Sequence, residues 1–176
     1  MRTIWRSIKF LLLCLSISAC GWQLRDSQLL SENLGAVQVV SENTQGSLAA
    51  ELNRQLQRYG VTQVNSDTEA NYRIVILASH YQRKTSALNA GARAAEYQLN
   101  GRVDFLVTDA RGNPLAPAAT AAVERYVDFD ETDILASDSQ EQLIKGAMQQ
   151  DIVRQILNQF SLIATKNAAT QSAADR

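Results

Sequence analysis

The most regular pattern in the chain is an alternation of apolar and polar residues between Glu96 and Val107. Odd-numbered positions carry an apolar residue or glycine, and even-numbered positions up to 104 are polar. A period of two is typical of a long strand with one buried face. Asp109–Pro114 has the composition of a turn, and Thr120–Asp128 follows as a second strand. We expect these two strands to pair in antiparallel fashion.

Two stretches have the period of an amphipathic helix. The first runs from about Leu48 to Tyr59 and ends before Gly60, a residue suited to the positive φ of a helix C-cap. The second runs from about Ser139 to Ile163, with Asp138 or Ser139 as its cap. Its apolar face comprises Ile144, Met148, Ile152, Ile156, Phe160 and Ile163.

Two shorter β-branched runs precede the long hairpin. Val37–Val40 is predicted to form the first strand, and Tyr72–Ala78 has the continuous apolar run of a central strand. The predicted order is therefore β-α-β-β-β-α. We expect an α+β fold with two layers, in which two helices pack on one face of a four-stranded mixed sheet. The first β-α-β unit should make its two strands parallel.

The N-terminus has the pattern of a secretory signal peptide. Arg2, Arg6 and Lys9 precede the apolar run Phe10–Ile17, which is too short to span a membrane, and small residues then lead into Cys20. A cysteine in this position is typical of bacterial lipoproteins, in which its thiol is lipidated after the signal is removed. Cys20 is therefore the predicted lipidation site.

Four segments follow from these assignments. They are a lipoprotein signal peptide over 1–19, a lipid anchor and polar tether over 20–35, a single domain over 36–164, and a disordered tail over 165–176. Aspartate after the lipidated cysteine commonly retains a lipoprotein in the inner membrane. Gly21 occupies that place here, so we expect attachment to the outer membrane of a Gram-negative cell.

Composition argues against several classes of function. Removing the first 19 of 176 residues leaves 157, with 14 basic and 18 acidic residues, a balance that does not suit a general nucleic-acid binder. The single histidine, His80, has no visible catalytic partner, and no zinc, calcium or phosphate-loop motif is present. We therefore predict no enzyme activity, no catalytic residues, no metal site and no cofactor.

Three basic residues are the remaining candidates for chemistry. Arg83 and Lys84 are expected to leave the second strand and Arg93 to enter the third, at the same end of the sheet. Arginine binds phosphate through paired hydrogen bonds, so such a group could hold a phosphorylated ligand. An ordinary charged loop is the alternative interpretation.

Five short segments carry a resemblance to a known family: Cys20–Asp26, Ala95–Leu99, Val123–Asp128, Ile134–Ala136 and Glu141–Asp151. In order and spacing they resemble the LptE family of lipopolysaccharide-assembly lipoproteins. The resemblance implies a plug inside the outer-membrane β-barrel LptD that supports barrel assembly, binds lipopolysaccharide and delivers it to the cell surface. Positions where the family has basic residues implicated in this contact correspond to Ala90 and Ser137.

The resemblance makes Arg83, Lys84 and Arg93 substitute candidates for lipopolysaccharide binding, by proximity alone. The alternative function is a different outer-membrane lipoprotein, one that docks a secretin or an envelope polymer.

Overall fold

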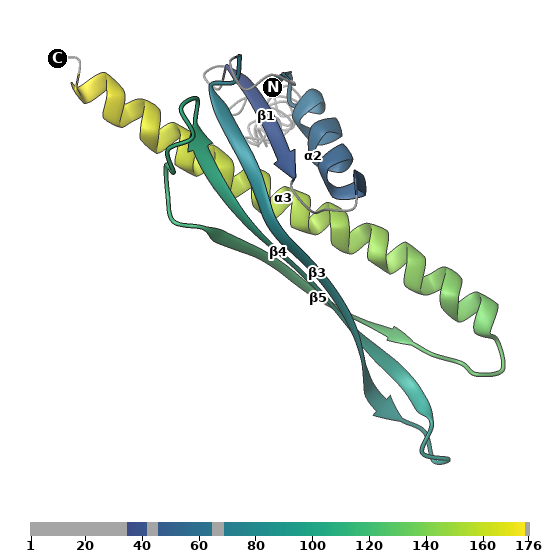
Figure 1. The fold of residues 1–176 in the computed structure, drawn as a ribbon. Helices are drawn as coiled ribbons and strands as arrows, with labels where there is room; N and C mark the ends of the chain where they lie inside the picture. The colour runs from purple at the N-terminus through teal and green to yellow at the C-terminus, as the bar shows by residue number, and fades with distance from the viewer. Residues whose placement is uncertain (1–34, 42–45, 65–68, 175–176) are drawn as a thin grey trace, which may run out of the picture.

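The computed structural model describes residues 35–41, 46–64 and 69–174, and it contains a five-stranded mixed sheet with two helices (Figure 1). Both helices contribute to one hydrophobic core against one face of the sheet, so the predicted α+β class is confirmed. In chain order the elements are β1 (Ala36–Ser41), α2 (Gly46–Arg58), β2 (Thr62–Gln63), β3 (Tyr72–Leu88), β4 (Ala94–Asp109), β5 (Ala119–Asp128) and α3 (Ile134–Ala174).

The sheet order is β2-β1-β3-β4-β5. As predicted, β1 pairs in parallel with the first part of β3, and β4 pairs with β5 in antiparallel fashion. β3 and β4 are also antiparallel. The four-stranded prediction missed β2, whose two residues pair with the start of β1. Two residues directly after a helix cap carry no periodic signal, so the sequence could not reveal this strand.

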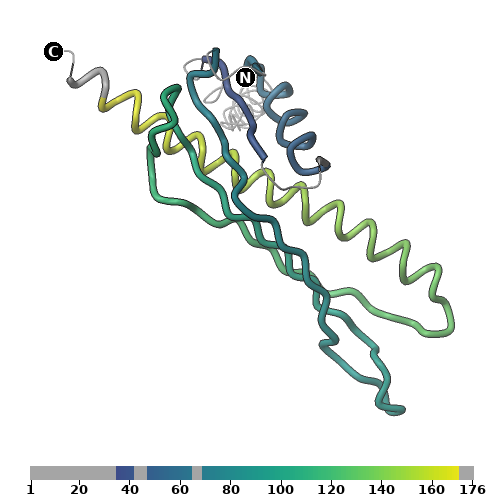
Figure 2. Tube along the Cα trace, viewed as in Figure 1, coloured from purple at the N-terminus to yellow at the C-terminus, as the bar shows by residue number. Residues whose placement is uncertain are grey.

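β3 is ten residues longer than the predicted strand, which ended at Ala78. Its second half is exposed and lacks the apolar run of the first half, because it extends beyond the core. The antiparallel ladder with β4 supplies its backbone partners as far as Leu88. β3 and β4 therefore form a long, twisted hairpin that projects from the end of the molecule (Figures 1 and 2).

α3 also exceeds its predicted bounds at both ends. It begins at Ile134, where the backbone N–H of Ala136 donates to Oδ1 of Asp133 at 3.1 Å, so Asp133 is the cap in place of Asp138 or Ser139. It continues to Ala174, so most of the stretch expected to be a disordered tail is helical. Alanine, which is frequent in that stretch, is the strongest helix former.

The core lies where α2 and α3 meet the inner face of the sheet. The predicted apolar face of α3 is confirmed at Met148, Ile152, Ile156 and Phe160, all of which are buried. Gly101 on β4 allows the close approach of α3, because a Cβ there would lie 3.1 Å from Cδ1 of Ile152 and 3.4 Å from Cε of Met148. The glycine in the alternating pattern thus marks the crossing of helix and strand.

Candidate functional site

The structure does not bring the three predicted basic residues together. Arg83 and Lys84 are consecutive residues inside β3, so their side chains lie on opposite faces of the sheet. Arg83 lies on the inner face, and its Nη1 is 2.8 Å from Oε2 of Glu141 on α3. Lys84 lies on the outer face, opposite Gln98 in the register. Arg93 lies beside the hairpin tip, just before β4 begins.

Arg93 is neutralised by an acid from another loop. Its Nη1 lies 2.7 Å from Oε1 of Glu131, which belongs to the connection between β5 and α3. Its backbone N–H donates to Oδ1 of Asn89 across the tip. Of the three candidates, Lys84 is the one for which the described residues provide no ion pair. The three therefore do not form a single phosphate site.

Glu141 joins the projecting hairpin to α3. Besides Arg83, it accepts a hydrogen bond from the Tyr81 hydroxyl at 3.4 Å, and Nζ of Lys145 lies 2.8 Å from Oε1. Lys145 also lies 4.6 Å from the centre of the Tyr81 ring, and the Arg83 guanidinium lies 4.5 Å from the centre of the Tyr97 ring. We call Tyr81, Arg83, Tyr97, Glu141 and Lys145 the Glu141 cluster.

The charges of this cluster follow from its contacts. Glu141 is only 7% exposed, and burial alone would raise its pKa, but hydrogen bonds from Lys145 and Arg83 outweigh burial and lower the pKa. Burial and the adjacent Glu141 carboxylate raise the pKa of Tyr81 to about 12. At neutral pH the Glu141 carboxylate therefore faces two cations, Arg83 and Lys145, and the phenol of Tyr81 stays protonated.

A second polar connection joins α3 to β5. Arg125 of β5 and Arg154 of α3 both pair with Asp151 of α3. The side-chain amide of Gln155 accepts from the N–H of Ala122 at 3.2 Å and donates to its carbonyl at 3.0 Å. At this point of the edge of β5, the Gln155 amide forms the two backbone hydrogen bonds that a neighbouring strand would otherwise form.

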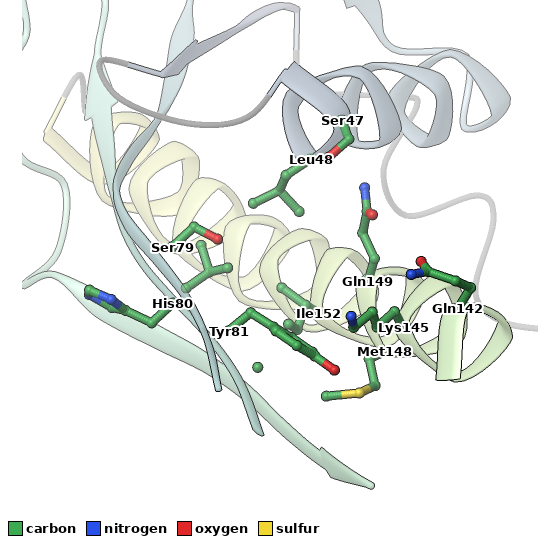
Figure 3. A pocket seen from close by; sticks show the side chains of 12 residues that line it. Ser47, Leu48, Ser79, His80, Tyr81, Gln142, Lys145, Met148, Gln149 and Ile152 are labelled. Atoms are coloured by element: carbon green, nitrogen blue, oxygen red, sulfur yellow. The ribbon is translucent and has the colours of Figure 1, made fainter. Parts of the chain in front are cut away.

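A groove of about 430 Å³ lies between the start of α2, the middle of α3 and the inner face of β3 and β4 (Figure 3). Leu48, Met148 and Ile152 supply apolar lining, while Gln142 and Gln149 supply amides. The side chain of His80 points away from the helices in this view, toward the outer face. His80 therefore belongs to the outer face, where the Asp104 carboxylate is an electrostatic neighbour.

The outer face of the sheet is polar, and neither of the described helices covers it (Figure 1). Arg102 contacts both Asp104 and Thr120 across two strands, and Tyr126 accepts from Gln98 and donates to Glu124. These short chains of hydrogen bonds follow the polar positions of the alternating pattern. Along β4 and β5, the described residues of this face form a polar surface, suited to contact with water or with another polar surface.

The described residues contain no cluster of metal-ligating side chains and no helix long and apolar enough to cross a membrane. Cys20, the predicted lipidation site, lies outside the described residues. The Glu141 cluster was not predicted from the sequence. The one available signal was the four-residue spacing of Glu141 and Lys145 on a helix, which is common on exposed surfaces and so does not indicate a buried cluster.

Comparisons with known proteins agree with this fold. The family model described as LptE, lipopolysaccharide-assembly, matches residues 34–160. The LPS-assembly lipoprotein LptE of Photorhabdus laumondii is 27% identical over 162 residues, covering 90% of this chain and 85% of its own.

Among solved structures, an uncharacterized lipoprotein B from Nitrosomonas europaea has a TM-score of 0.71 at 24% identity, covering 82% of this chain and 93% of its own. Rare lipoprotein B from Shewanella oneidensis has a TM-score of 0.62 at 19% identity, covering 80% and 99%. At these identities, the structures establish the shared fold alone.

Proposed function

The chain belongs to the LptE lipopolysaccharide-assembly family, and from this we propose that it is an outer-membrane lipoprotein that plugs and supports the LptD β-barrel during lipopolysaccharide transport. The match to the family over most of the predicted domain is the observation that carries this proposal. In this proposal the chain acts by binding the barrel and lipopolysaccharide, without catalysis or a cofactor. Lipidation at Cys20 would hold the domain at the periplasmic side of the membrane, next to the barrel lumen.

The shape and surface of the domain support a plug. Wide membrane barrels have a polar lumen, so a protein seated there needs a polar surface around its own compact core. The outer face of the sheet provides such a surface, and the β3–β4 hairpin extends the molecule into a long, narrow body (Figure 2). Because one core holds both helices against the sheet, the domain can enter the lumen as a folded unit.

Co-purification tests this proposal. When the chain is expressed with its LptD barrel, we expect the two to purify as a stable complex of about one to one, measured by size-exclusion chromatography with light scattering. Without the chain, folded and correctly oxidised barrel should be scarce. A barrel that matures at an unchanged yield and forms no complex would contradict the proposal, and capture of a secretin instead would favour the alternative function.

Lipopolysaccharide binding by the basic residues stays a prediction, and the structure changes how to test it. Arg83 is unsuitable because it also holds the Glu141 cluster. Lys84→Glu combined with Arg93→Glu should weaken binding of purified lipopolysaccharide by about tenfold, since exposed charge contacts to phosphate are individually modest. Fluorescence anisotropy with labelled lipopolysaccharide measures the change.

Arg111→Glu combined with Lys166→Glu is the matched control, because it makes the same change in net charge at exposed positions away from the hairpin tip. Equal affinities of the two double variants would show that Lys84 and Arg93 have no particular role in the contact.

A further inference from the structure

One edge of the sheet is left without a neighbour along the projecting hairpin. β1 pairs with β3 only from Tyr72 to Ile76. Among the described residues, no strand lies beside β3 from Leu77 onward on the side away from β4. Ala78–Thr85 keeps an unbroken register with β4, with irregularities just before and just after it. This open edge is about 26 Å long, at about 3.3 Å per residue.

The opposite edge of the sheet is tied to α3 at Ala122. On β5, the Gln155 amide bonds both backbone groups of Ala122, and Arg125 is tied to Asp151 on the same helix. Proteins commonly cover or blunt their strand edges, because an exposed row of backbone groups pairs readily with another chain. The two edges of this sheet therefore differ: β5 is blocked at Ala122, whereas no contact from the described residues bonds the outward backbone of Ala78–Thr85.

The groove lies directly beside this open edge. Its lining includes Ser79 and Tyr81 of β3, and its apolar residues come from α2 and α3 (Figure 3). A strand added beside Ala78–Thr85 would lie on the same side of β3 as β1, which pairs with the preceding residues Tyr72–Ile76. Alternate side chains of that strand would face α3 and reach Leu48, Met148 and Ile152. An apolar residue at every second position fits this floor.

The charge around the open edge indicates which side chains the added strand would carry at its other, outward-facing positions. β3 carries no acidic residue from Leu77 to Leu88 but contains Arg83 and Lys84. Lys145 adds a third cation beside the groove, against two carboxylates: Glu141, which Arg83 and Lys145 share, and Glu96, which contacts Ser86. This region is therefore positive in a chain that has a net charge of −1, and it favours a strand whose polar positions are acidic.

We propose that Ala78–Thr85 of β3 binds an extended acidic segment of a partner protein, which adds to the sheet as a further strand and places alternate apolar side chains in the groove. Backbone hydrogen bonds supply the affinity, while the groove and the surrounding cations select the sequence. The proposal concerns a docking surface and does not require that the barrel supply the segment, so it can fail while the proposed function holds.

A synthetic peptide of four Glu-Val repeats, blocked at both ends, is the probe. When it is added to the purified mature chain, we expect amide hydrogen exchange of Ala78–Thr85 to slow by about tenfold at saturation, with no change in β5. A peptide with lysine in place of glutamate should bind more weakly. A Glu-Val peptide methylated on every backbone nitrogen should not bind, because it has the same charges but no N–H donors.

Gln82→Glu adds a negative charge at the open edge and should weaken peptide binding by about threefold. Gln150→Glu makes the same change at an exposed position of α3 outside the groove and should leave binding unchanged. Equal binding of the methylated peptide, or protection outside β3, would overturn the proposal. So would doubling of the molecular mass with protection of the same amides in the absence of peptide, since a second copy would then be the occupant.

Discussion

Replacing Phe160 with alanine should lower the free energy of unfolding by about 3–5 kcal/mol, the usual cost of removing a fully buried phenylalanine. Phe160 lies on α3 with no exposed surface, and its ring meets that of Tyr72 on β3 edge to face, with 5.9 Å between centroids. The truncation removes this contact and leaves a cavity where the helix crosses the sheet. Urea denaturation followed by circular dichroism measures the loss.

Leu162→Ala is the control for this prediction. Leu162 is on the same helix two residues further on, but it is 72% exposed. Its truncation should change the free energy of unfolding by about 0.5 kcal/mol or less. Similar losses for the two variants would mean that the inner face of α3 is not packed on the sheet as described.

Glu141→Gln should lower the free energy of unfolding by about 1–2 kcal/mol. Glutamine keeps the shape of the side chain but removes the charge that Arg83 and Lys145 share, leaving two neighbouring cations with no carboxylate. Breaking a fully buried pair costs more, but both cations are partly exposed to solvent, which reduces the effect. Urea denaturation measures the loss, and amide exchange of β3 should quicken mainly beyond Leu77.

The effect of Glu141→Gln should depend on pH in a defined direction. The pKa of Glu141 in the folded chain is below its ordinary value of 4.5, so its stabilisation is present above that value. It is lost as the pH falls through the folded pKa, and the gap between the original chain and the variant should close there. Asp138→Asn, an exposed change on the same helix, is the control and should produce little gap at any pH. A gap that widens in acid would contradict the assigned charges.

Phe160 and Glu141 stabilise different parts of the molecule, the main core and the projecting half of β3. Phe160 belongs to the main core, where loss of packing destabilises the whole domain. Glu141 acts beyond it, holding the exposed half of β3 against α3 and thereby positioning the open edge and the groove. A variant at Glu141 can therefore disturb a docking surface while the core remains folded.

Much of the fold was predictable because it depends on burial. The strand containing Tyr97–Val107 and the helix face from Met148 to Phe160 each repeat with the period of their backbone, and both were confirmed. The second half of β3 was not predicted. There the strand has no core to face, so no apolar alternation marks it, and only the ladder with β4 makes it regular.

The missed second half of β3 also explains why Arg83, Lys84 and Arg93 were wrongly expected to lie together. With the strand assumed to end at Ala78, Arg83 and Lys84 were expected together in a loop near Arg93. As members of a strand, the first two lie on opposite faces, and the first is bound to an acid 58 positions away. A local sequence pattern contains no information about such a distant partner.

Local patterns in the sequence were enough to establish the α+β class and the amphipathic faces, and they predict a lipoprotein signal over 1–19, because hydrophobic periodicity and signal motifs are local properties of the chain. The tertiary structure decided which charges meet, which strand edge Gln155 covers, and where α3 leaves a groove beside β3. Each of these depends on residues far apart in the sequence that the packing of α3 on the sheet brings together.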